Sequence, residues 1–171
     1  MNIDLQTKNI VKTKLEQRGN EYKIKAPVTG SVVLNNAVVA SFGDGSLLFF
    51  GLNQEPFEVK AHKGVILTMS SNGQFVYTGG DDGKFLKISS DGQINEIYNF
   101  GSQWVDCVAS TENYFACSSG KKAYLWVNVD SKPLIMDNSS TVGGLSFDLD
   151  GNKLAVSSYG GVTVWQRGDR R

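Results

Sequence analysis

A unit of short apolar runs and Gly/Asp turns recurs along this chain, and this repeat constrains the fold more than any other feature. Its clearest copy is residues 72–88, where a β-branched and aromatic run at 75–78 is followed by Gly-Gly-Asp-Asp-Gly and an alternating run at 85–88. Two such runs joined by a Gly/Asp turn are typical of a β-hairpin. The large residues that end the third run of each unit are Phe50, Ile88, Trp126 and Trp165, separated by 38, 38 and 39 residues.

The whole chain can be divided into strands in the same way. We expect strands at 31–34, 37–42, 46–50 and 57–60; at 65–69, 75–78, 84–88 and 94–98; at 104–109, 114–117, 123–127 and 133–136; and at 142–147, 153–156 and 162–166. Nineteen glycines against three prolines fit many tight turns between short strands. Four-stranded units of about 40 residues predict an all-β fold made of propeller blades.

Residues 1–26 precede the repeat and are polar and lysine-rich. In residues 21–25, Tyr22 and Ile24 alternate with charged side chains, which predicts a half-buried edge strand. Further upstream the pattern leaves two alternatives open, since residues 10–15 fit a strand and residues 7–17 fit a helix about equally well.

Three stretches of sequence resemble the WD-repeat β-propeller family. They are Ser-Ser-Asn-Gly at 70–73, Thr-Gly-Gly-Asp-Asp-Gly at 78–83, and Ser-Phe-Asp-Leu-Asp-Gly at 146–151 followed by Leu154 and Trp165. The likeness extends over residues 28–166, although the Trp-Asp dipeptide of the family is absent. It implies a partial propeller or half-ring of about four four-stranded antiparallel blades, at 28–62, 63–101, 102–140 and 141–171, after an N-terminal extension at 1–26.

The resemblance also implies a structural network inside a blade, in which His, Thr or Ser, Asp and a Trp indole are linked by hydrogen bonds. The second blade supplies His62, Thr78 and Asp82, or Asp81 in its place, but carries Ile88 where the Trp belongs. Trp126 and Trp165 end the third strands of their blades, and we expect both to be largely buried. On that basis Trp165→Ala would cost roughly 3–5 kcal/mol of stability.

Composition argues against several kinds of site. Seventeen basic and 17 acidic residues give a net charge of zero, so we expect neither nucleic acid nor an anionic membrane as a partner. We expect a cytoplasmic protein, because residues 1–6 lack a basic and apolar leader pattern and no apolar run approaches about 20 residues.

No residue pattern predicts a catalytic, metal or cofactor site. His62 is the only histidine and there are two cysteines, which excludes a conventional zinc site. Asp44, Asp81, Asp82 and Asp150 lie in Gly-containing turns, where Asp is favoured because its side chain bonds the local backbone. In the predicted inner strands only Asp106 is ionisable.

We expect Cys107 and Cys117 to be buried core residues with ordinary thiol groups. A short turn near Glu112 would place them on neighbouring antiparallel strands, with the two residues opposite each other and within disulfide distance. We nevertheless expect free thiols, because the chain reads as cytoplasmic.

The function predicted from this sequence is a non-catalytic protein-interaction scaffold. Candidate interaction residues are the polar and aromatic side chains of the turns and of the entries to the inner strands, namely Asp44, Lys63, Asp81, Gln103, Trp104, Lys121, Lys122 and Tyr159. Two alternatives stay open: an enzyme or small-ligand binder with a site at the central channel, and a structural subunit that assembles with further copies of itself. The expected partners are therefore other proteins, including a second copy of this chain.

The predicted fourth blade has three strands, which raises the question of how the ring closes. Residues 21–25 precede the first inner strand, where an outer strand belongs. They could close a four-bladed ring within one chain, or complete the fourth blade of a second copy in an eight-bladed homodimer. The chain could also be half of a larger propeller.

Overall fold

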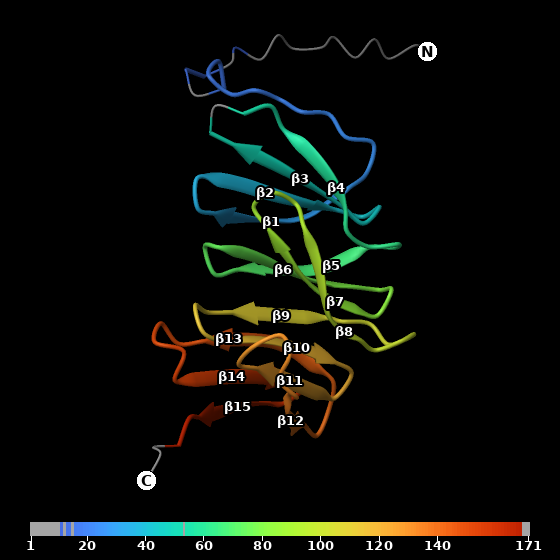
Figure 1. Cartoon of the computed structure of the whole chain (residues 1–171), viewed down its shortest axis with the longest axis vertical. Helices are drawn as coiled ribbons and strands as arrows, with labels where there is room; N and C mark the ends of the chain where they lie inside the picture. The colour runs from blue at the N-terminus through green and yellow to red at the C-terminus, as the bar shows by residue number, and fades with distance from the viewer. Residues whose placement is uncertain (1–10, 12, 15, 53, 169–171) are drawn as a thin grey trace, which may run out of the picture.

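Four small antiparallel sheets follow one another in a row (Figure 1). The computed structural model describes residues 11, 13, 14, 16–52 and 54–168. Each sheet is one unit of the repeat, and we refer to them as blades 1 to 4. All the strands predicted within the repeat, from residue 31 to residue 166, are formed, with ends that differ by three residues or fewer from those expected.

The strands alternate with tight turns along the whole row. Blade 1 contains β1 (Val28–Leu34), β2 (Ala37–Phe42), β3 (Ser46–Gly51) and β4 (Phe57–Lys60). Blade 2 contains β5 (Ile66–Ser71), β6 (Phe75–Gly80), β7 (Lys84–Ser89) and β8 (Ile94–Asn99). Blade 3 contains β9 (Cys107–Ser110), β10 (Phe115–Ser119), β11 (Lys122–Trp126) and β12 (Leu134–Asp137), and blade 4 contains β13 (Val142–Phe147), β14 (Lys153–Ser158) and β15 (Gly161–Gln166).

Strand order in every sheet follows the sequence. The first strands β1, β5, β9 and β13 contact one another in turn, so they form the inner edge of the row. Blades 1 and 4 lie at opposite ends (Figure 1). The chain therefore does not form the closed four-bladed ring that was one of the alternatives, because the end of blade 4 is far from residues 21–25.

The core lies between the blades, in three separate apolar clusters. Within a strand, successive side chains point to opposite faces of the sheet. One face of each blade therefore packs on the preceding blade and the other on the following blade. Val76 and Ile88 illustrate the first face, since both are fully buried against Val39 and Phe49 of blade 1.

The four large residues that mark the repeat occupy equivalent places. Phe50, Ile88, Trp126 and Trp165 pair across the sheet with Val38, Val76, Phe115 and Leu154 respectively. In blades 2 and 3 this cross-strand row packs on the preceding blade. Blade 1 has no preceding blade among the described residues, and its Val38 is 46% exposed where Val76 is 0% exposed.

The prediction that both tryptophans are buried is correct for Trp126 and wrong for Trp165. Trp126 is 1% exposed and lies among Phe85, Phe115 and Tyr124, whereas Trp165 is 42% exposed. The reason is that blade 4 is a three-stranded sheet ending in β15, so no outer strand covers its margin within the described part of the chain.

The prediction that Cys107 and Cys117 lie directly opposite each other is wrong by one residue. Cys107 pairs with Ser118, and Cys117 pairs with Val108. A shift of one residue reverses the face to which a side chain points. Cys117 accordingly packs toward blade 2 and Cys107 toward blade 4, and both thiols are free.

Residues 21–25 are not part of any sheet in this structure, so the strand predicted there is not formed by the single chain. They pass over the exposed face of blade 1 (Figure 1), where the rings of Tyr22 and Phe50 lie 5.0 Å apart. An extended segment needs the free edge of a sheet to become a strand, and this one has none beside it. Of the region 7–17, residues 7–10, 12 and 15 lie outside the described residues, and residues 11, 13, 14, 16 and 17 form neither helix nor strand.

The two tryptophans provide a test of this packing. We expect Trp126→Ala to cost about 3–5 kcal/mol, because it empties a buried aromatic cluster. Trp165→Ala will cost clearly less, because much of that side chain already lies in water. Urea unfolding of both variants as single chains, at concentrations where light scattering shows a monomer, measures the difference, and equal losses would contradict the unpartnered margin of blade 4 in the single chain.

The two thiols provide a second test. Because their side chains leave opposite faces of one sheet, oxidation of the folded chain should not join them. Mass spectrometry after alkylation under non-reducing conditions should show two alkylated cysteines once the protein is denatured. A loss of two protons in place of the two alkyl groups would show a disulfide and contradict this register.

Candidate functional site

One end of the blades gathers the predicted interaction residues. The turns between second and third strands and the connections from one blade to the next all lie at this end, which we call the loop face. It comprises residues 43–45, 61–65, 81–83, 100–106, 120–121, 138–141 and 159–160. All eight predicted residues lie in these segments except Lys122, which begins β11 directly after them.

Backbone hydrogen bonds hold the segments of the loop face together. Ala61 N donates to Gly45 O at 3.0 Å, Phe100 N donates to Gly83 O at 2.8 Å, and Asn138 N donates to Lys121 O at 3.0 Å. Each bond joins the tight turn of one blade to the connection that leads to the next blade. The loop face is therefore a fixed surface rather than a set of independent loops.

The side chains on the loop face are largely exposed. Trp104 is 59% exposed, so it does not pack between blades. Tyr159, Gln103, Lys63, Lys121 and Asp44 are exposed as well, whereas Asp81 is partly buried. Lys122 Nζ lies 3.3 Å from Asp137 Oδ1 on the outer strand of the same blade, so it faces the margin of blade 3.

His62 lies at the base of the loop face in a chain of hydrogen bonds. Its Nδ1 is 2.8 Å from Asp82 Oδ1, and its Nε2 is 2.8 Å from Thr78 Oγ1. A carboxylate can only accept, so Nδ1 carries a proton and donates to Asp82. Nε2 and the Thr78 hydroxyl share the second hydrogen bond. The other oxygen of Asp82 accepts from Lys63 N at 3.0 Å.

Burial by itself raises the pKa of Asp82, but hydrogen bonds donated by His62, Lys63 and Lys84 lower it by more, so the pKa lies below its usual range. The network is buried and all of its groups are partnered, which is the arrangement of a structural element rather than of a proton donor open to substrate. Neither Trp126 nor Trp165 belongs to it, since Ile88 holds the equivalent place in this blade.

Gly80 leaves the space that His62 needs. A Cβ at this position would lie 2.4 Å from His62 Nδ1 and 2.8 Å from Asp82 Oδ1. A nonbonded Cβ carbon does not approach other heavy atoms so closely, so any side chain at Gly80 would displace the imidazole. The Gly-Gly-Asp-Asp-Gly stretch therefore forms a turn and also provides the space in which the His62 ring packs. The sequence pattern did not reveal this second role.

The other turn aspartates differ in their contacts. Asp44 Oδ1 accepts from Ser46 Oγ at 2.7 Å and from Ser46 N at 3.1 Å, and these bonds lower its pKa. In the turn between β13 and β14, at the end of blade 4 opposite the loop face, Asp148 accepts from Lys153 N at 2.9 Å, while Asp150 is exposed.

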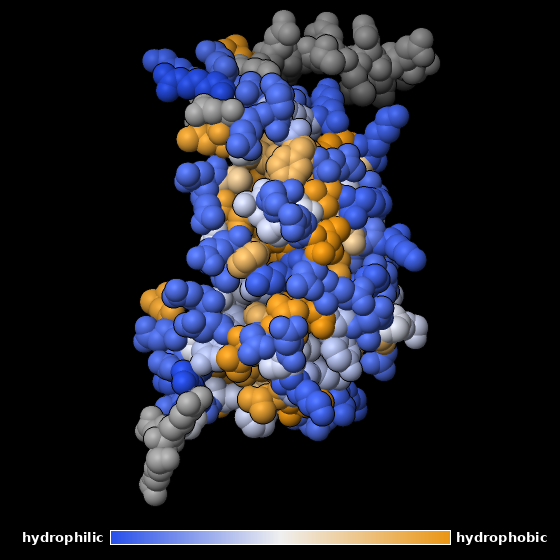
Figure 2. Space-filling model, in the orientation of Figure 1, coloured by the Kyte–Doolittle hydropathy of each residue, from blue (hydrophilic) through white to orange (hydrophobic). Residues whose placement is uncertain are grey.

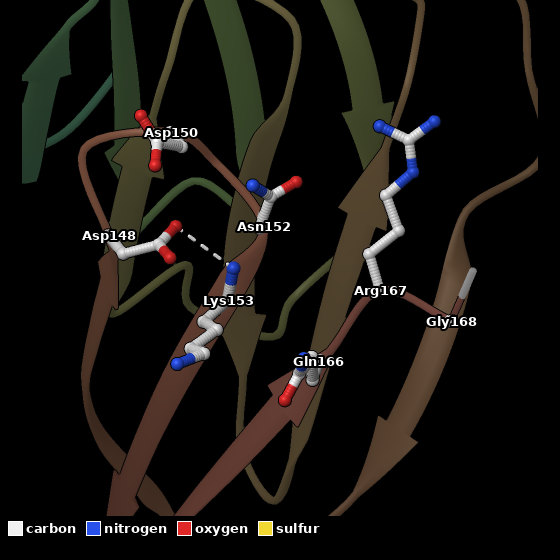
Figure 3. Close-up of a pocket in the computed structure, with 7 residues that line it drawn as sticks. All are labelled: Asp148, Asp150, Asn152, Lys153, Gln166, Arg167 and Gly168. Atoms are coloured by element: carbon white, nitrogen blue, oxygen red, sulfur yellow. Dashed lines mark hydrogen bonds between the residues drawn. The ribbon is translucent and has the colours of Figure 1, made fainter.

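A polar pocket of about 500 Å³ lies at that end of blade 4 (Figure 3). Asp148 and Asp150 line one side and Arg167 lies across from them (Figure 3). The Arg167 guanidinium is instead 5.9 Å from the ring centre of Tyr114, and Asp148 caps its own turn. This pocket is therefore a polar hollow between the turn at 148–153 and residues 166–168, and Asp148 and Arg167 do not form an acid–base pair in it.

The described residues contain neither a metal-binding cluster nor a membrane-spanning helix. No three His, Cys, Asp or Glu side chains among them gather closely enough to hold a metal ion. Within the same part of the chain there is no helix with the length and apolarity that crossing a membrane requires.

Comparisons with known proteins identify the repeat. Residues 54–86 match the family described as WD domain, G-beta repeat. These residues hold both His62 and Asp82. The four blades have a fold of the WD-repeat type.

Solved structures extend this likeness to nearly the whole chain. The computationally designed Ika4 protein superposes with a TM-score of 0.70 at 21% identity, over 88% of this chain and 99% of Ika4. U3-55K gives a TM-score of 0.73 at 15% identity over 85% of this chain and 50% of its own, and the WD40 repeats of RRP9 give 0.71 at 15% over 84% and 49%. At such identities the likeness shows the fold alone, and the WD-repeat chain spans about half the length of U3-55K and of the RRP9 repeats. No curated protein sequence gives a significant match.

One cavity was not anticipated from the sequence. A mostly apolar space of about 610 Å³ lies between blades 3 and 4, lined among others by Val127, Leu134, Met136 and Trp165. It borders β15, the strand without an outer neighbour. The absence of a predicted fourth strand in blade 4 was the sequence feature that could have indicated this cavity. The repeat pattern did not show which side chains would be left uncovered.

The buried network can be tested through pH. We expect Asp82→Asn to cost about 1–3 kcal/mol at neutral pH, because it weakens hydrogen bonds to a buried ring. Since the pKa of Asp82 is depressed in the fold, its contribution is present above the unfolded value of about 3.9 and is lost as pH falls through the folded value. The difference between wild type and variant should therefore shrink below about pH 4.

Asp150→Asn is the matched control, because it makes the same change at an exposed turn. Urea unfolding at a series of pH values measures both variants against wild type. If Asp150→Asn lost as much stability as Asp82→Asn, the network would not be what the carboxylate stabilises.

Proposed function

We propose that this WD-repeat chain is a non-catalytic scaffold whose loop face binds other proteins. The observation that carries the proposal is the exposed Trp104 in the middle of a surface that the backbone holds fixed. Tryptophan is enriched among the residues that dominate binding energy at protein interfaces. An exposed Trp on a rigid loop therefore supports protein binding more directly than any other feature of this chain.

The surroundings of Trp104 suit such an interface. Lys63, Lys121, Asp44 and Asp81 give the loop face charges of both signs, and a polar rim around an apolar centre is the usual anatomy of an interface. The family supports the same reading, because WD-repeat propellers typically serve as interaction scaffolds.

The test is to identify bound proteins by pull-down and then measure their affinity with purified components. Trp104→Ala should weaken binding at least 10-fold. Leu149→Ala is the control, because Leu149 is a fully exposed apolar residue in the turn at the opposite end of blade 4. Equal affinity of wild type and Trp104→Ala would remove Trp104 from the interface.

The alternative of a small-ligand or catalytic site at the central channel has a different signature. If no protein bound and one compound of a metabolite panel raised the melting temperature in proportion to its concentration, the scaffold proposal would give way to that alternative. The inner strands offer little chemistry for it, since β1, β5, β9 and β13 contain no Asp, Glu, His, Lys or Arg.

The proposal includes a cytoplasmic location and no binding of nucleic acid or membrane lipid. The expectation that the chain binds neither nucleic acid nor membrane lipid rests on its net charge of zero, because contacts to phosphate need an excess of basic side chains. Imaging of the tagged chain in cells and a gel-shift assay with DNA and RNA would test these two points.

A second role, that of a structural subunit which assembles with another copy, is supported by a separate observation. The outer edge of β15 has no neighbouring strand in its sheet, and an unpaired edge is a place where another chain can add. We propose that the partners of this chain include a second copy of itself.

A further inference from the structure

The two ends of the row expose surfaces that are buried everywhere else in it. At blade 1, Val38 and Phe50 belong to the cross-strand row that in blades 2 and 3 packs on the preceding blade. At blade 4, Val162 and Val164 are exposed, and their equivalents in blade 1, Leu47 and Phe49, are buried against blade 2. One end thus lacks a preceding blade and the other lacks a following blade.

These two surfaces complement each other. Each is one half of the contact that joins blade 1 to blade 2 and blade 2 to blade 3 within the chain. Both are apolar, so bringing them together removes apolar surface from water at about 25 cal/mol per Å². Figure 2 shows, on the face it presents, apolar side chains interspersed among the hydrophilic ones along the length of the row.

Residues 21–25 already lie where an outer strand of a preceding blade would lie. Tyr98, on the outer strand of blade 2, contacts Trp126 of blade 3, with ring centres 5.9 Å apart and planes at 51°. Tyr22 contacts Phe50 of blade 1 at 5.0 Å and 58°. Phe50 and Trp126 hold equivalent places, and the sequence separation is the same in both pairs, since 126 − 98 = 28 and 50 − 22 = 28.

The sequence of the segment also suits an outer strand. Tyr22 and Ile24 alternate with Glu21, Lys23 and Lys25, as Phe57 and Val59 alternate with Glu58 and Lys60 in β4. In β4 the two apolar residues pack toward the following blade. Tyr22 likewise packs toward the blade that follows it, which is blade 1. An outer strand pairs with the third strand of its own blade, and residues 21–25 have no such strand beside them.

β15 is a strand of the kind that is missing there. Its inner edge pairs with β14 along its whole length, from Gly161 with Ser158 to Gln166 with Lys153, and its other edge borders the apolar cavity beside Trp165. A fourth strand on this edge would satisfy its free N–H and C=O groups and cover more of Trp165.

Within one chain the segment and β15 cannot meet, because they lie at opposite ends of the row (Figure 1). Two chains can meet at both ends. The row superposes on about half of U3-55K and of the RRP9 WD40 repeats with TM-scores of 0.73 and 0.71, so its blades are arranged like those in half of such a structure. Two copies related by a twofold axis would then complete one ring.

We propose that two copies of this chain close a single eight-bladed ring, in which residues 21–25 of each copy form the fourth strand beside β15 of the other. This inference deepens the second role proposed above and does not depend on binding at the loop face. Each copy supplies the strand that the other lacks, so the ring has two identical junctions.

Light scattering after size exclusion tests the assembly. The wild type should have a mass of about 37 kDa, which is twice the 18.6 kDa of one chain, over a range of micromolar concentrations. Tyr22→Glu combined with Ile24→Glu should raise the dissociation constant of the dimer at least 10-fold. The variant monomer should stay folded by circular dichroism, because residues 21–25 belong to no sheet of the single chain.

The matched control is Lys23→Glu combined with Lys25→Glu, which places the same side chains on the solvent side of the strand and should leave the dimer intact. Amide hydrogen exchange gives a second readout, since the amides of Gly161–Gln166 should exchange more slowly in the wild-type dimer than in the variant. A folded wild-type monomer at high micromolar concentration would overturn the proposal, and so would open oligomers larger than two.

Two other outcomes are equally decisive. If Tyr22→Glu with Ile24→Glu dimerised as tightly as wild type, residues 21–25 would not be the exchanged strand. A monomer that still bound a protein through Trp104 would refute the dimer and leave the loop-face proposal standing, while a dimer with no protein partner would do the reverse.

Discussion

Packing of apolar cross-strand rows between neighbouring blades is the interaction on which this structure depends. A four-stranded sheet of short strands is marginal by itself, and each blade here has two apolar faces rather than one. Burying a large apolar side chain contributes about 1.5–3 kcal/mol, and the rows around Phe49, Ile88 and Trp126 place several such residues at each junction. Every blade is therefore stabilised chiefly by its neighbours.

This dependence explains why the ends of the row differ from its middle. Trp126 and Trp165 are the same residue at the same place in the repeat, yet one has a complete blade around it and the other borders a free edge. Stability in repeat architectures is a sum over units and their interfaces, so the terminal blades carry the deficit. The surfaces exposed there are those that further blades would cover, and the same packing rule thus connects the fold to assembly.

The hydrogen-bonded chain through His62 has a different role. It joins the connection after β4 to the turn between β6 and β7, and so fixes the loop face where blade 1 passes into blade 2. Because buried polar groups are costly unless partnered, the network stabilises one arrangement of these segments and disfavours others. A rigid loop face can hold Trp104 exposed without disturbing the apolar junctions beneath it.

The sequence by itself determined the number of blades, the strands and the turns, because these follow from local rules. Alternation of apolar residues and Gly/Asp turns is readable from a window of a few residues, and the constant spacing of Phe50, Ile88, Trp126 and Trp165 aligned the windows. The residues of the His62 network could also be predicted from the sequence, since the resemblance to WD repeats placed His62, Thr78 and Asp82 in one blade. The loop face followed from strand order, because alternate turns of an antiparallel sheet lie at one end.

Only the tertiary structure decided what each of these residues touches. The register of β9 on β10 sent Cys107 and Cys117 to opposite faces, which a one-residue uncertainty in turn length had concealed. The exposure of Trp165 and the position of Tyr22 on Phe50 depend on which blades are neighbours. The space for His62 depends on Gly80, the last residue of β6, which lies 18 residues further along the chain. Such facts arise from contacts between segments far apart in the chain, and no local pattern contains them.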